Sequence, residues 1–60
     1  MMLYYLVMYN HLRNHYARFM ISSHDEEEAK SRAIGSLGFH YRLSSILPVC
    51  KTDEQVFIEL

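Results

Sequence analysis

The chain has 60 residues, of which 50% are hydrophobic, and its formal net charge is −1. This composition predicts one small folded domain over residues 1–60, because the chain is too apolar for a disordered segment and lacks the basic excess of nucleic-acid-binding proteins. The single cysteine excludes an internal disulfide and, without an export signal, predicts a cytoplasmic protein. Since domains of this size are marginally stable alone, we expect a homodimer.

The first half of the chain predicts a β-hairpin. Leu3–Tyr9 is rich in residues that favour strands, and it is far shorter than the roughly 20 residues of a membrane span, so no membrane contact is expected. Asn10–His15 interrupts the apolar run with two asparagines, which tolerate turn geometry. The alternating segment Tyr16–Ser22 then predicts the second strand.

An acidic run, Asp25–Glu28, predicts the start of a helix, where carboxylates interact favourably with the positive end of the helix dipole. Ser23, with Glu26 three residues later, predicts a capping box in which Ser23 is the N-cap. Gly38 predicts the helix end. The apolar stripe of this helix, built mostly of small residues that allow close packing on a sheet, consists of Ala29, Ala33, Ile34 and Leu37.

The segment after the helix predicts a third strand that begins at Phe39, has a bulge near Ser44 and Ser45, and ends at Pro48. The last residues, Val56–Leu60, can form a short fourth strand. The order of elements therefore predicts an α+β fold: an antiparallel β-sheet in the order β-β-α-β, with the fourth C-terminal strand and with one helix packed on one face.

The sequence predicts no catalytic site, metal site or cofactor. His11 and His15 are four residues apart, as in helical zinc sites, but they flank a turn and no second pair of ligands follows at metal spacing. Cys50 does not stand in a cysteine-enzyme signature, and a small fold with a single helix leaves little room for a substrate cleft. We therefore expect that the protein is not an enzyme.

The predicted interaction surface is the sheet face opposite the helix or an exposed strand edge, whose backbone could pair with a partner strand. Tyrosine, methionine and arginine are enriched in interface cores, where they bury a large area and keep a polar group available. The predicted partner-binding residues are Tyr5, Tyr9, Tyr16, Arg18, Met20 and Arg42. A second copy of the chain could instead cover this face for stability alone.

Two further alternatives remain open at the level of sequence. The protein could be a small dimeric nucleic-acid-associated regulator whose arginines gather on one side, and binding would then weaken steeply with added salt. The arginines in question are Arg13, Arg18, Arg32 and Arg42. The protein could also be a structural subunit of a larger assembly.

The order of the elements, together with the short segments "DEEEAKSRA", "GF" and "PVCK", resembles the small β-β-α-β proteins that bacteriophages make to disable host machinery. The layout is most similar to that of phage-encoded inhibitors of bacterial RNA polymerase, and the resemblance covers Tyr4 to about Lys51. It implies a non-enzymatic inhibitor in the host cytoplasm that docks on a larger host protein, a host enzyme or a defence complex, and occludes it.

Overall fold

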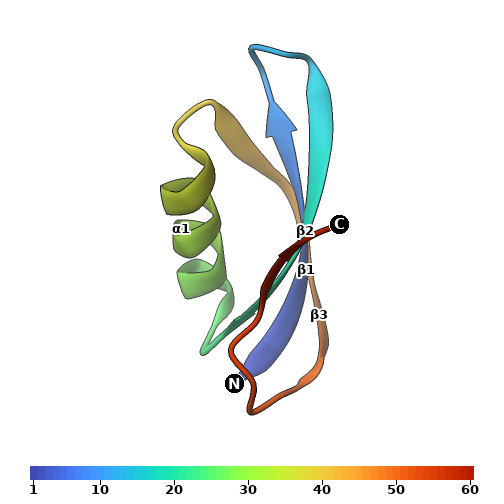
Figure 1. The fold of residues 1–60 in the computed structure, drawn as a ribbon, viewed down its shortest axis with the longest axis vertical. Helices are drawn as coiled ribbons and strands as arrows, with labels where there is room; N and C mark the ends of the chain where they lie inside the picture. The colour runs from blue at the N-terminus through green and yellow to red at the C-terminus, as the bar shows by residue number, and fades with distance from the viewer.

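The computed structural model describes all 60 residues and contains one helix and a four-stranded antiparallel sheet. The elements are β1 (Met2–Asn10), β2 (His15–Ser23), α1 (Glu26–Leu37), β3 (Tyr41–Lys51) and β4 (Phe57–Glu59). The strands lie in the order β3-β1-β2-β4, and α1 packs on one face of the sheet while the other face has no covering element (Figure 1). The predicted α+β fold, with its short fourth strand, is confirmed.

The core lies between α1 and the sheet. Side chains alternate between the two faces of a strand, and the buried side chains of β1 are the even-numbered ones. Two small residues of α1, Ala29 and Ala33, are fully buried, so the helix lies close to the sheet, as the apolar stripe predicted. The core residues are Tyr4, Leu6, Met8, Phe19, Ile21, Ala29 and Ala33.

Both asparagines shape the hairpin turn between β1 and β2. Asn10 is buried at the end of β1, and its Oδ1 accepts hydrogen bonds from the backbone N–H groups of Leu12 (3.0 Å) and Arg13 (3.1 Å). Asn14 has a φ of 54°, in the left-handed region that asparagine tolerates better than most residues. Its Oδ1 accepts a hydrogen bond from the Tyr9 hydroxyl. The predicted hairpin is confirmed, with Asn10 inside β1 instead of in the turn.

The start of α1 differs from the sequence prediction. The N-cap is Asp25, whose Oδ1 accepts a hydrogen bond from the Glu28 N–H at 2.8 Å. The Ser23 hydroxyl instead bonds to the backbone of Asp25, accepting from its N–H at 3.2 Å and donating to its carbonyl. The predicted capping box of Ser23 and Glu26 is therefore wrong, because aspartate is an equally good N-cap and stands nearer the helix. Gly38 ends the helix with a φ of 99°, as predicted.

Replacing Asp25 with alanine should lower the free energy of unfolding by about 1 kcal/mol, because the Glu28 N–H loses its cap. Urea denaturation followed by circular dichroism would measure the loss. The matched control is Glu26→Ala, which removes a carboxylate from the same turn without removing the cap and should cost only about 0.3 kcal/mol. A larger loss for Glu26→Ala than for Asp25→Ala would mean that the capping box of Ser23 and Glu26 operates in solution.

β3 is displaced and longer than the sequence predicted. It spans Tyr41–Lys51, so the predicted start at Phe39 and the predicted end at Pro48 are both wrong. A proline fits within this strand because β3 lies at an edge of the sheet, where not every N–H has a partner strand. The predicted bulge is confirmed: the register with β1 skips Ser44, and a second irregularity skips Val49.

β4 is attached to β2 at the other edge of the sheet. The Val56 N–H donates to the Ser22 Oγ at 2.7 Å, and the Ser22 N–H donates to the Val56 carbonyl at 3.0 Å. The Leu60 N–H donates to the Arg18 carbonyl at 2.8 Å. From α1, the Arg32 guanidinium donates to the Ser22 carbonyl. The bonds of Val56 and Leu60 hold the C-terminal strand in register beside β2, and the bond of Arg32 joins α1 to β2.

Candidate functional site: the open face of the sheet

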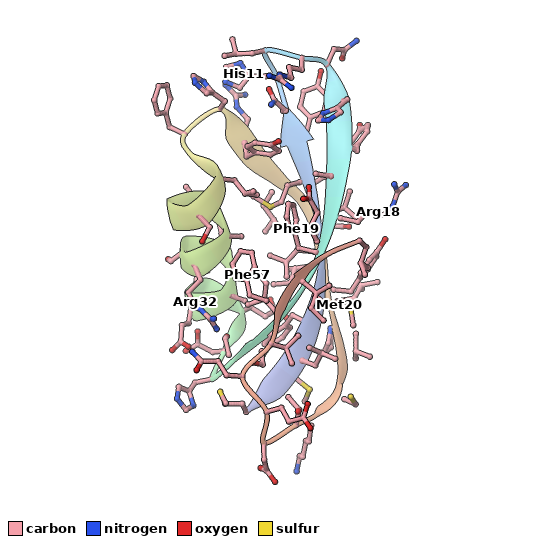
Figure 2. All side chains as sticks on the ribbon, viewed as in Figure 1. His11, Arg18, Phe19, Met20, Arg32 and Phe57 are labelled. Carbon is pink, nitrogen blue, oxygen red and sulfur yellow. The ribbon has the colours of Figure 1, made fainter.

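The candidate site is the open face, which we define as the side of the sheet turned away from α1. It is formed by the odd-numbered side chains of β1 and by their register partners in the neighbouring strands. The odd-numbered side chains of β1 are only partly buried, in contrast to the even-numbered ones under the helix. In Figure 2, Arg18 extends from the sheet away from α1, whereas Phe19 and Phe57 lie on the α1 side.

All six residues predicted to bind a partner lie on the open face. They are Tyr5, Tyr9, Tyr16, Arg18, Met20 and Arg42. In the ladder between β1 and β2, Tyr5 is opposite Met20 and Tyr9 is opposite Tyr16. In the ladder between β1 and β3, Arg42 is opposite Tyr9. The structure therefore brings the six residues onto one surface, and their role in binding stays a prediction.

An apolar row crosses the open face over the full width of the sheet. Its members are register partners from one edge to the other: Leu47 of β3, Tyr5 of β1, Met20 of β2 and Ile58 of β4. Leu47 and Ile58, at the two ends of the row, are 57% and 52% exposed, whereas Tyr5 and Met20 are partly buried between them. We call these four residues the apolar row.

The sequence analysis missed both ends of the apolar row. A strand with unbroken alternation would place Ile46 on the same face as Arg42. The bulge at Ser44 shifts this alternation, so that Leu47 shares the open face with Arg42 and Ile46 packs against the core. The bulge was predicted, but the sequence prediction did not include the change of sheet face that the bulge causes for the residues after it. Ile58 was missed because the face of so short a strand depends on its register with β2.

A second region of the open face lies closer to the hairpin turn and contains tyrosines and arginines. The rings of Tyr9 and Tyr16 are 5.1 Å apart between centroids and tilted by 52°, an arrangement typical of packed aromatic pairs. Arg18 is opposite Val7, and Arg42 is opposite Tyr9, so the arginines lie on the two sides of β1. Both arginines are exposed.

No acidic residue lies on the open face. β1, β2 and β3 contain neither aspartate nor glutamate. Glu59 of β4 is opposite Phe19, which places it on the α1 side. The acidic residues of the chain are Asp25, Glu26, Glu27, Glu28, Asp53, Glu54 and Glu59. Arg18 and Arg42 therefore have no acidic side chain beside them on their own surface, although the terminal carboxylate of Leu60 follows the backbone bond between Leu60 and Arg18.

The four arginines of the nucleic-acid alternative do not gather on one side. Arg18 and Arg42 lie on the open face, whereas Arg13 lies in the hairpin turn. Arg32 is on α1, which covers the opposite face, and bonds there to a backbone carbonyl. The open face thus has two arginines, fewer than this alternative assumed.

The remaining candidates from the sequence do not form a cluster with metal-binding geometry. The rings of His11 and His40 lie 6.1 Å apart between centroids, and no group of three or more His, Cys, Asp or Glu side chains is arranged to hold a metal ion. Cys50 is a free, exposed cysteine on β3. The surface has no detectable pocket, and α1 is neither long nor apolar enough to cross a bilayer.

Comparisons with known protein families, with curated proteins and with solved structures found no match to this chain.

Proposed function

We propose that this chain is a non-enzymatic protein-binding module that docks through its open face on a larger protein and occludes that protein's working surface. The observation that carries the proposal is the apolar row, which reaches both edges of the sheet and has two exposed arginines on its hairpin side. In keeping with the resemblance in layout, we propose that the chain acts as an inhibitor of phage or mobile-element origin on a host enzyme or defence complex.

The composition of the open face supports a protein as the partner. Tyrosine and arginine are the residue types most often found at the energetic centre of protein interfaces, where they are surrounded by contacts that exclude water. The open face holds Tyr5, Tyr9 and Tyr16 beside Arg18 and Arg42. Because these side chains project from paired strands, their backbone is already ordered before binding, and ordering it costs little conformational entropy on association.

The edges of the sheet are less suited to docking than the face. Addition of a partner strand requires an extended edge with regular, unpaired backbone groups. β3 has Pro48, two register irregularities and a terminal lysine, Lys51, all of which are features that discourage edge pairing. β4 has only three residues. We therefore assign docking to the open face.

Charge reversal at Arg18 tests the proposal, and Tyr5→Ala tests the apolar row. We expect Arg18→Glu to abolish partner binding without changing the circular dichroism spectrum, because this side chain is exposed and makes no core contact. Tyr5→Ala should also abolish binding, because it removes the largest side chain of the apolar row. The measurement is affinity capture of the tagged chain from a bacterial lysate, with washes at low and at high salt, followed by mass spectrometry.

The matched control for this experiment is Phe39→Ala, which removes an aromatic ring that is 81% exposed and lies outside the open face. One stoichiometric protein that survives high salt with the wild type and with the control, but not with Arg18→Glu, is the expected result. Normal capture by Arg18→Glu would count against this surface. Nucleic acid retained only at low salt would support the regulator, and recovery of the chain alone would support a self-contained oligomer.

A further inference from the structure

The two regions of the open face point to the chemistry of the partner. We infer that the segment that docks here is amphipathic and acidic: apolar side chains contact the apolar row, and carboxylates contact Arg18 and Arg42. This inference rests on the proposed function and adds the class of ligand to it. The carrying observations are the exposed ends of the apolar row and the complete absence of acidic residues from the open face.

The spacing of the two regions sets the spacing of the partner's groups. Along β1, Val7 (opposite Arg18) and Tyr9 (opposite Arg42) are two and four residues beyond Tyr5. At about 3.3 Å per residue, the arginines therefore originate roughly 7 and 13 Å from the apolar row. A helical partner rises about 1.5 Å per residue, so its carboxylates would follow its apolar contacts after roughly one to two and a half turns.

The charges on the open face favour carboxylates as the counterpart. When docking removes water from an arginine, the guanidinium needs an anion and hydrogen-bond acceptors, and a carboxylate supplies both in bidentate geometry. The strands of the open face provide no acidic side chain to Arg18 or Arg42. Like charges brought together in a docked interface oppose association, so the partner surface must be acidic where it meets these residues.

A second copy of the chain does not meet this requirement through the same face. In a two-fold symmetric dimer the same surface patch is used by both subunits. Two open faces packed together would thus supply no acidic side chain to the arginines of either copy. The acidic residues at the start of α1 lie outside this face.

Nucleic acid is a poorer match than an acidic protein segment. Binding of phosphates gains its affinity from several clustered cations, and single strands also stack on free aromatic faces. The open face has two arginines, the rings of Tyr9 and Tyr16 pack on each other, and the exposed ends of the apolar row, Leu47 and Ile58, are aliphatic. Exposed aliphatic side chains of this kind are better matched to apolar side chains of another protein than to the bases of a nucleic acid.

The test is a selection from a displayed library of random peptides, carried out in parallel with the wild type and with Arg18→Glu/Arg42→Glu. The wild type should enrich peptides that combine apolar residues with Asp or Glu, and the reversed variant should enrich Lys and Arg instead. Synthetic versions of the wild-type peptides should bind the reversed variant roughly tenfold more weakly or worse, since each reversal replaces attraction by repulsion. The matched control is the double variant Arg13→Glu/Lys51→Glu, which changes the net charge by the same amount at positions outside the open face. It should bind these peptides like the wild type.

The outcomes separate this inference from the proposed function. Enriched peptides that are apolar without acidic residues, and that bind the reversed variant equally well, would overturn the inference and leave protein docking intact. No enrichment by the wild type, or binding of single-stranded oligonucleotides alone, would overturn both. Circular dichroism and sedimentation of all three proteins establish that the variants are folded and that self-association does not account for the difference.

Discussion

Replacing Phe19 with alanine is expected to remove a large part of the stability of the fold. Phe19 is 1% exposed in the centre of the core, opposite Leu6 of β1, and its ring packs edge-on against Phe57. Loss of a buried phenylalanine ring costs about 3–5 kcal/mol. A domain of 60 residues has a total stability of roughly 3–9 kcal/mol, so this single loss removes between about a third and all of it. Far-ultraviolet circular dichroism and dispersion of amide chemical shifts would measure the unfolded fraction.

Phe39 provides the matched control, because the same truncation there removes a ring that is 81% exposed. Phe39→Ala should change the free energy of unfolding by less than about 0.5 kcal/mol, the usual range for surface substitutions. If Phe19→Ala were as stable as Phe39→Ala, the core would not be centred on β1 and β2 as described.

Replacing Ala33 with leucine is expected to destabilise the fold by about 1–3 kcal/mol, because the added side chain has no space at the contact between α1 and the sheet. Ala33 has no accessible surface, so the helix would have to move outward to accommodate three further carbon atoms. Urea denaturation would measure the loss, and a lowered slope of the transition would indicate a looser native state.

Ser31→Leu is the control for the same helix. Ser31 is exposed, so a leucine there adds similar bulk without entering the core. Its effect on the free energy of unfolding should stay within about 0.5 kcal/mol. Because leucine is a better helix former than serine, helix propensity cannot destabilise Ser31→Leu, and equal destabilisation by the two leucines would contradict the close contact of Ala33 with the sheet.

The sequence of β2 indicates more clearly than the sequence of β1 which face of the sheet α1 covers. Both alternating sets of β1 side chains are apolar, so β1 alone does not distinguish the two faces. In β2, one alternating set contains Phe19 and Ile21, whereas the other contains Arg18, whose charge disfavours burial. Pairing the two strands then assigns the even-numbered residues of β1 to the core. The six predicted interface residues all lie on the face that contains Arg18.

The helix start and the ends of β3 could not be predicted because the competing alternatives differ little in energy. Ser23 and Asp25 are comparable N-cap residues, and the choice between them depends on where the chain leaves β2. Pro48 usually ends a strand, but the position of β3 at the sheet edge permits it to continue. The strand order that creates this edge is a property of the whole fold and is not encoded near Pro48.

The central position of β1 also affects how the chain can be made. β1 is the first strand of the sequence, yet it pairs on one side with β2 and on the other with β3, where Leu3 is opposite Cys50. β1 has no charged residue and no proline, and such strongly strand-forming segments readily pair with other chains when their edges are free. During synthesis one edge of β1 therefore stays unpaired until the residues of β3 have been made, and in that interval β1 is the segment of this protein most prone to aggregation.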